Sequence, residues 1–174
     1  AEEDRRQAIY LIQSHAIALA NGVEQLQWFC LDDWAEKWGL VRTFDPVDVK
    51  PSYKAYQMMT KALGSPGKCA EFEGYATVGR EVACYVFKKA DGKRVLIMWG
   101  GGEGRKPVTL RQKSGLDAVD ILGNEIDVKE GRFTVDEVPV IVTNVDAKLL
   151  GAVSKAANPH CERPGRNQLN NGSL

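Results

Sequence analysis

The stretch VEQLQWFCL, residues 23–31, decides how the first part of this chain folds. It ends in an apolar and aromatic run, and Asn21-Gly22 separates it from a helical pattern before it. A glycine such as Gly22 can adopt the left-handed conformation that closes a helix. β-Branched and aromatic members favour a strand for residues 23–31. The sequence therefore predicts a helix over residues 3–20 that is followed by a strand.

Apolar residues on both sides of this stretch recur at helical spacing. Before it, one face of an amphipathic helix carries Ile9, Ile12, Ala16 and Leu19. After it, Pro51 suits the first position of a helix, apolar residues then recur at steps of three and four, and Gly64 provides a stop. The first 64 residues are thus expected to form an α-β-α segment, residues 1–64.

The pattern changes from helical to strand-like after the breaker cluster at residues 65–68. Residues 81–99 alternate around Asp91-Gly92, which predicts a β-hairpin. Further short strands are expected at residues 108–111, 118–122, 132–135 and 138–143. Such strands without intervening helices indicate an antiparallel β-sandwich domain over residues 68–145. Residues 146–174 are rich in Asn, Gly and Pro and are expected to form an irregular tail. The predicted class is α+β.

Composition limits the possible partners. The chain has 23 basic and 23 acidic residues, so no net field attracts it to nucleic acid or to an anionic membrane. No apolar run approaches the roughly 18 residues of a membrane span. Four cysteines lie far apart and only two histidines accompany them, which predicts neither a metal site nor a cofactor. Cys30 and Cys84 suit core packing, and a disulfide between Cys69 and Cys161 stays open.

The glycine-rich residues 100–107 invite a phosphate-loop interpretation, but the details disagree. A P-loop needs Gly-Lys followed by Ser or Thr and then a helix. Here Arg105 interrupts the pair, Pro107 follows the Lys, and strand-like residues come next. The stretch is better explained as a flexible connection between strands.

Several segments, taken in order, resemble the closing part of a (β/α)8 glycoside hydrolase. Residues 18–29, 38–42 and 50–56 are similar to the seventh helix, eighth strand and eighth helix of retaining, family 39-like members. A β-sandwich follows the barrel in those proteins, and residues 95–99, 120–124 and 138–143 resemble its strands. The match covers roughly residues 5–143 and rests on order and spacing.

The resemblance implies a C-terminal fragment or subunit of a glycoside hydrolase that degrades polysaccharides, with the sandwich supporting the barrel. In such enzymes two carboxyl groups about 5 Å apart perform catalysis. In this superfamily they follow strands four and seven, which would precede Ala1. No catalytic residue can therefore be assigned in this chain, and the chain alone is predicted to be inactive. A secreted or periplasmic protein would fit the family.

The resemblance also implies substrate-binding residues at the end of strand eight. Trp28 would form an aromatic platform under a sugar ring, although core packing remains open for it. Asp33, Trp34 and Trp38 would lie in the following loop and line the carbohydrate cleft. Asp32 and Asp33 are not expected to act as an acid and nucleophile pair, because adjacent residues of an extended chain point to opposite sides.

Two other functions remain compatible with the sequence. A free-standing carbohydrate-binding sandwich would use Tyr75, Tyr85 or Trp99 for stacking. An assembly module would instead use residues 1–64, whose unpaired strand edges call for the remaining barrel portion or a second copy.

Overall fold

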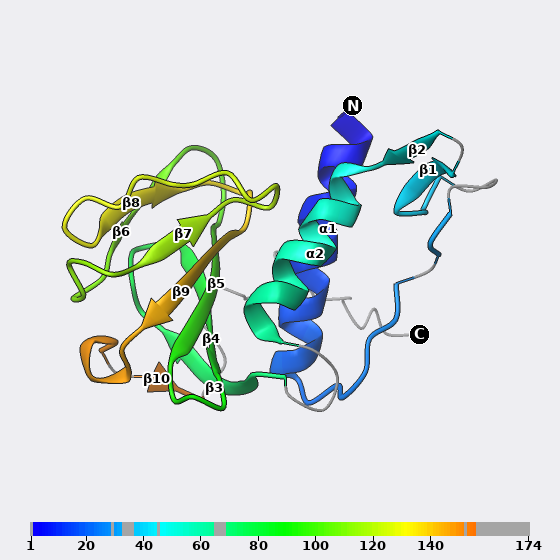
Figure 1. Ribbon diagram of the computed structural model, residues 1–174. Helices are drawn as coiled ribbons and strands as arrows, with labels where there is room; N and C mark the ends of the chain where they lie inside the picture. Colours follow the sequence, from blue (N-terminus) through cyan, green and yellow to red (C-terminus); the bar gives the residue numbers. More distant parts are fainter. Residues whose placement is uncertain are drawn as a thin grey trace, which may run out of the picture.

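The computed structural model in Figure 1 describes residues 2–28, 30–32, 37–44, 46–64, 69–151 and 153–155. It contains two helices, ten strands and one 3-10 turn within these ranges. In chain order they are α1 (Glu2–Ala20), β1 (Val41–Phe44), β2 (Val47–Val49), α2 (Pro51–Leu63), β3 (Glu71–Ala76), β4 (Val82–Lys88), β5 (Arg94–Gly100), β6 (Lys106–Thr109), β7 (Asp117–Val119), β8 (Arg132–Val135), β9 (Val140–Val145), η1 (Ala147–Leu149) and β10 (Val153–Ser154). The predicted α+β class is confirmed.

Both predicted helices form where the sequence places them. α1 has three acidic residues in its first turn, which suits the positive end of the helix dipole. It ends at Ala20, and Gly22, with a φ of 78°, lets the Val23 N–H donate back to the Ala18 carbonyl at 3.0 Å. α2 begins with Pro51 and ends where the Gly64 N–H donates to the Thr60 carbonyl at 2.8 Å.

After α2, the described strands form one large and one small antiparallel sheet, while β1 and β2 form a separate two-stranded sheet before it. The large sheet has the order β10-β3-β4-β5-β9-β7, and β6 pairs with β8 in the small one. The centre of the large sheet is the predicted hairpin of β4 and β5. Its paired residues run from Val82 opposite Gly100 to Lys88 opposite Arg94. The predicted strands at residues 108–111, 118–122, 132–135 and 138–143 correspond to β6, β7, β8 and β9, with shifts of a few residues.

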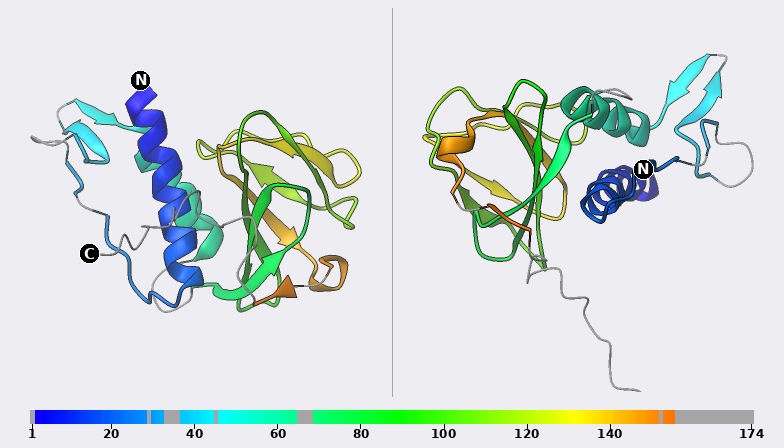
Figure 2. Two further views of the ribbon diagram at one scale, coloured as in Figure 1. Left: turned by 180° about the vertical axis from the view of Figure 1, so that it is seen from behind. Right: turned by 90° about the horizontal axis from the view of Figure 1, so that it is seen from below.

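Both faces of the large sheet are buried. One face, with Cys84, Val86, Leu96 and Met98, packs against Phe133 and other residues of the small sheet. The other face, with Phe87 and Ile97 among its residues, packs against apolar residues of both helices, including Leu11 and Met59. The helices lie side by side on this second face (Figures 1 and 2). The molecule therefore has three layers: helices, large sheet and small sheet.

The predicted strand at residues 23–31 is wrong. Its described residues are extended but belong to no sheet, and the nearest pairing is a single parallel bridge between Asp32 and Val41. A strand needs a neighbour that accepts its hydrogen bonds, and no backbone hydrogen bond joins residues 24–28 to any described segment. The strands between the two helices are instead β1 and β2, a hairpin in which Val41 pairs with Val49.

Two strands at one side of the large sheet, β3 and the edge strand β10, were not predicted. β3 contains Glu71, Glu73 and Gly74, and so has a weak apolar pattern. β10 pairs with it, opposite Tyr75 and Ala76, and lies in the segment expected to be an irregular tail. A Cβ on Gly74 would meet the Ser154 carbonyl oxygen at 2.7 Å, so glycine permits this close approach.

The predicted domain boundary at residues 65–68 and the tail beyond residue 155 lie outside the described residues. The division into residues 1–64 and 68–145 remains a prediction. Both helices nevertheless share one apolar core with the large sheet.

The glycine-rich stretch connects two strands, as expected. β5 ends at Gly100 and β6 begins at Lys106, so a strand follows where a phosphate loop would need a helix. Lys106 forms an ion pair with Glu81 at 2.8 Å.

Candidate functional site

Two of the predicted site residues meet in the structure. The indole N–H of Trp28 donates to the Trp38 carbonyl at 3.0 Å. Trp28 is half-buried and packs against the core, whereas the Trp38 side chain is 55% exposed. Asp33 and Trp34, the other two predicted residues, lie outside the described residues.

Three consecutive carbonyls around Trp38 accept hydrogen bonds from side chains of distant segments. Besides the bond from Trp28, the Gln7 amide donates to the Trp38 carbonyl at 2.6 Å and to the Gly39 carbonyl at 3.1 Å. Lys50 donates to the Lys37 carbonyl at 2.7 Å. We call Gln7, Trp28 and Lys50 the loop clamp. It ties residues 37–39 to α1, to the extended segment and to the start of α2.

The loop clamp is itself held by buried polar groups. Lys50 is only 2% exposed, and its ammonium lies 3.8 Å from an Asp4 carboxylate oxygen. Ser52, fully buried, donates to the Gln7 side-chain oxygen at 3.3 Å. Gln7 therefore uses both ends of its amide and has one available orientation.

A second charged group lies beside this network. Arg42 forms ion pairs with Asp4 at 2.8 Å and with Asp48 at 2.9 Å. Burial alone would raise the pKa of Asp4, but the hydrogen bond and charge of Arg42 outweigh it and lower that pKa. Asp4 thus stays ionised between two cations, Arg42 and Lys50.

His15 supports Trp28 from within the core. Its ring stacks near Trp28 with centroids 6.4 Å apart and meets the edge of Tyr56 at 5.8 Å. Nδ1 donates to the Leu11 carbonyl at 2.7 Å when it carries the proton, while Nε2 is buried without a hydrogen-bond partner. Burial lowers the pKa of His15, and the bond to Leu11 opposes this only in part. The ring is therefore neutral at pH 7.

The side chains suggested for a free-standing sugar-binding sandwich are largely committed to packing. Tyr85 stacks on Trp99 with centroids 5.0 Å apart and meets Tyr75 at 5.2 Å. Tyr85 is 2% exposed, so the expectation that it could stack on a sugar is wrong. Tyr75 and Trp99 are half-buried and pack against the same core.

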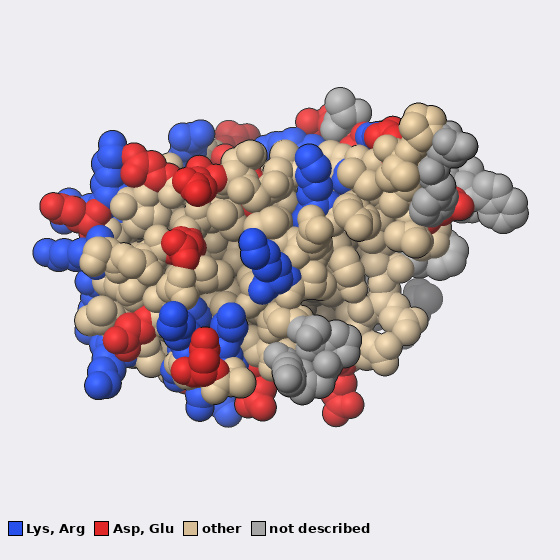
Figure 3. All heavy atoms as spheres, in the orientation of Figure 1, with Lys and Arg blue, Asp and Glu red and all other residues tan. Residues whose placement is uncertain are grey.

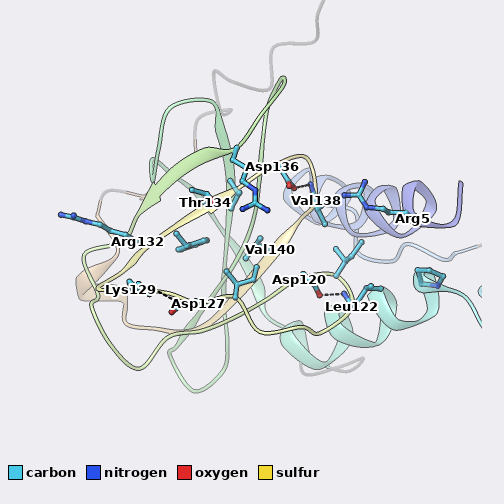
Figure 4. Close-up of a pocket in the computed structure, with 16 residues that line it drawn as sticks. Arg5, Asp120, Leu122, Asp127, Lys129, Arg132, Thr134, Asp136, Val138 and Val140 are labelled. Atoms are coloured by element: carbon cyan, nitrogen blue, oxygen red, sulfur yellow. Dashed lines mark hydrogen bonds and ion pairs between the residues drawn. The ribbon is translucent and has the colours of Figure 1, made fainter. Parts of the chain in front are cut away.

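A separate cavity lies between the two sheets and the N-terminal turns of the helices (Figure 4). It has a volume of about 690 Å³, and both Arg5 and Pro51 line it. Three carboxylates line it: Asp120 accepts from the Leu122 N–H at 2.8 Å, Asp136 accepts from the Val138 N–H at 2.9 Å, and Asp127 forms an ion pair with Lys129 at 3.1 Å. This arrangement stabilises loops and provides no acid and base pair.

Charge is mixed over the face drawn in Figure 3, where basic and acidic side chains alternate. A smaller groove of about 360 Å³ is lined by Lys61, Lys89 and Lys93 as well as by Asp117. Lys93 donates to the Asn144 side-chain oxygen at 3.0 Å. The mixed charge matches the neutral balance of the sequence.

Within the described residues, no three His, Cys, Asp or Glu side chains gather as a metal site would require. Cys30 and Cys84 are free thiols, Cys69 is exposed, and Cys161 lies outside the described ranges. Burial raises the pKa of Cys84 to about 12, which suits an unreactive core thiol. None of the described helices is long and apolar enough to cross a membrane.

Sequence reasoning found the two tryptophans but missed Gln7 and Lys50. Gln7 carried a usable signal, since it precedes Leu11 by one helical turn on the apolar face of α1. Lys50 carried none, because a lysine before a helix is ordinarily solvated.

Comparison with known proteins gives one informative likeness. No family model matches the chain, and no curated protein matches it. Among solved structures, the chain is similar to a family 39 glycoside hydrolase from the gut symbiont Bacteroides cellulosilyticus WH2, with a TM-score of 0.61 and 18% identity. The likeness covers 80% of this chain but only 30% of that one. At this identity it establishes a shared fold.

Proposed function

We propose that this chain forms the C-terminal part, or a separate subunit, of a glycoside hydrolase related to family 39. The structural likeness carries the proposal, because most of this chain corresponds to less than a third of the longer enzyme. In this proposal the sandwich supports a (β/α)8 barrel to which α1, the extended segment at residues 23–31 and α2 belong.

The open side of the N-terminal segment supports the proposal. Residues 24–28 are extended, and their backbone groups form no hydrogen bond with other described residues. α1 leaves Tyr10 and Ile17, two turns apart, exposed on its outer side. Unpaired extended backbone beside exposed apolar side chains is typical of a surface that another element covers. The remaining barrel portion fits this role best, and a second copy is the other partner that could supply a strand.

The position of the clamped loop supports a role at a carbohydrate cleft. The N-terminal ends of α1 and α2 lie together, at the end of the molecule that carries β1 and β2 (Figure 1). Active sites of (β/α)8 barrels lie at the end where the strands lead into the helix N-termini. Among the described residues, 37–44 and 46–50 lie at this end, so we propose that Trp38, with Asp33 and Trp34, lines the cleft.

The chain alone should not hydrolyse glycosides. A retaining enzyme needs two carboxyl groups about 5 Å apart, one as acid and base and one as nucleophile. The family positions of that pair, after strands four and seven, have no counterpart in residues 1–174. Of the described carboxylates beside the clamped loop, Asp4 pairs with Arg42 and Lys50, and Asp48 pairs with Arg42.

The mass and activity of the native gene product test the proposal. We expect a product with some 250 further residues upstream, which hydrolyses aryl glycosides with retention of configuration. The 174-residue chain should be inactive in the same assay. A native product that begins near Ala1, or a longer one without hydrolase activity on a broad glycoside panel, would contradict the proposal.

A further inference from the structure

The smaller groove, between α2 and the large sheet, brings three lysines together from two separate parts of the chain. Its volume is about 360 Å³. Lys61 reaches it from the last turn of α2, whereas Lys89 and Lys93 reach it from the turn between β4 and β5. Among the described residues that line it, Asp117 is the one acidic side chain. The groove thus has an excess of two positive charges in a chain whose basic and acidic residues balance.

Three polar side chains of the groove have no partner among the described residues. Neither Lys61 nor Lys89 forms an ion pair or a side-chain hydrogen bond with them, although Lys89 is half-buried. The hydroxyl of Thr143, half-buried on β9, has no such partner either. A lysine in the last turn of a helix also suits the helix dipole, but the dipole does not explain Lys89 or Thr143. These groups are available to a bound acceptor.

The acidic residue of the groove is directed to an amide. Asn144 donates through its side-chain nitrogen to Asp117, and its side-chain oxygen accepts from Lys93 at 3.0 Å. Its backbone lies in the left-handed region, with a φ of 61°. Asp117 forms no ion pair with either of the other two lysines. Their positive charges therefore remain uncompensated by any described carboxylate of the groove.

The chemistry of the groove defines the class of its ligand. All of its cations are lysines, whose ammonium groups bind phosphate oxygens as point charges, whereas the planar fork of arginine matches a carboxylate. A phosphate monoester carries a charge of about −1.5 to −2 at pH 7, which matches the excess of two positive charges. The volume falls within the range of small-molecule sites, roughly 300–1,000 Å³. Apolar side chains complete the lining: Met58, Ala62, Val119 and Ile141.

We propose that this groove binds a small phosphorylated organic molecule, with Lys61, Lys89 and Thr143 contacting the phosphate and the apolar side chains contacting the organic body. The site is independent of the proposed function. α2 begins next to β2, at the end of the molecule where the cleft is proposed, and its last turn, with Lys61, lies at the opposite end of the helix (Figure 1).

A proton–nitrogen NMR titration of the 174-residue chain with phenyl phosphate tests the site residue by residue. Phenyl phosphate joins a phosphate monoester to a flat apolar ring. At pH 7.5 and low salt we expect saturable shifts of the amide signals of residues 61, 89, 119 and 143. Inorganic phosphate, which lacks the ring, and benzoate, which carries one negative charge, should bind several-fold more weakly. The absence of saturable shifts at these residues, or affinity for either control anion equal to that for phenyl phosphate, would overturn the proposal.

Lys89→Gln tests the role of the half-buried lysine. We expect it to weaken phenyl phosphate binding about tenfold or more, because it removes one charge-assisted hydrogen bond. Lys54→Gln is the matched control: it removes the same charge from an exposed residue of α2 that does not line the groove. It should leave the affinity unchanged within about twofold. Equal weakening in both variants would show a general attraction of anions and would contradict a site.

Thr143→Val tests the hydroxyl, because it keeps the shape of the side chain on β9. The expected result is about threefold weaker binding of phenyl phosphate, the effect of losing one neutral hydrogen bond. Unchanged affinity would contradict the role of Thr143. All of these measurements follow binding without hydrolysis, so failure of the phosphate site leaves the proposed function untouched, and failure of the proposed function leaves the phosphate site untouched.

Discussion

The large sheet and the N-terminal segment differ in how fully each is covered. In β4, six consecutive residues from Val82 to Phe87 are buried, because helices cover one face and the small sheet covers the other. In residues 24–28 the chain is also drawn out (Figure 1), yet its backbone forms no hydrogen bond with the described residues. Extended conformation alone therefore does not make a strand, since a strand also needs neighbours. Because of this difference, we expect a further strand or helix to pack against the N-terminal segment.

The largest effect is expected from removing a side chain at the layer where the two regions join. Phe87 is fully buried in the core shared by sheet and helices. Phe87→Ala should lower the free energy of unfolding by about 3–5 kcal/mol, because it leaves a cavity. Urea denaturation followed by circular dichroism measures this. Tyr10→Ala, on the open side of α1, should cost less than about 0.5 kcal/mol. Similar losses in both variants would show that the open side is covered within this chain.

Substitution of two glycines, Gly131 in the sandwich and Gly22 in the N-terminal segment, tests how tightly the backbone is packed in each region. A Cβ on Gly131 would lie 2.4 Å from the Leu110 carbonyl oxygen, whereas one on Gly22 would meet nothing within 4 Å. Both residues have positive φ, 76° and 78°, so the conformational penalty is shared. Gly131→Ala should therefore cost about 2 kcal/mol more than Gly22→Ala, measured by thermal unfolding. Equal costs would mean that the sandwich turn relaxes freely.

Acid should weaken the N-terminal packing through His15. The folded-state pKa of His15 is lowered, so the unfolded chain binds more protons below its ordinary pKa of about 6.5. This contribution to stability is complete above about pH 6.5 and is lost as the pH falls below it. Unfolding free energies measured between about pH 7.5 and 5 should decrease, and His15→Phe should flatten that decrease. An identical pH profile in the variant would assign the effect to other groups.

The smallest effect on stability is expected at Trp38. Its side chain is mostly exposed, and the clamp bonds its backbone, which alanine retains. Trp38→Ala should change the free energy of unfolding by less than about 0.5 kcal/mol. A loss above about 2 kcal/mol in urea denaturation would mean that the indole serves packing and not ligand binding.

Local patterns predicted the elements that local chemistry determines. Pro51 and Gly64 bracket α2, Asn21-Gly22 ends α1, and Asp91-Gly92 turns the central hairpin, each through the conformational preference of that residue. The strand β3 and its edge neighbour β10 could not be predicted in this way. Their pairing depends on contact between segments some 80 residues apart, for which Glu71 and Glu73 provide no apolar signal.

In the candidate site, too, some residues could be predicted from local sequence and others only from tertiary contacts. The family resemblance suggested Trp28 and Trp38, with Asp33 and Trp34, as cleft residues, and the structure joins the two described ones through one hydrogen bond. The roles of Gln7 and Lys50 depend on tertiary contact, since they reach the loop across 31 and 13 positions of sequence. The error at residues 23–31 has a related cause. A barrel strand pairs with a neighbouring strand on each side. The described residues of this chain provide no such neighbours for residues 24–28.

Hydrogen exchange at the backbone amides of residues 24–28 tests the central claim most directly. In the 174-residue chain these amides should exchange as fast as unstructured peptide, because they have no described acceptor. In the native gene product they should be strongly protected, comparably to the amides of β4 and β5, because neighbouring barrel strands would pair with them. Fast exchange of residues 24–28 in the native product would contradict the claim that this segment completes a glycoside hydrolase barrel.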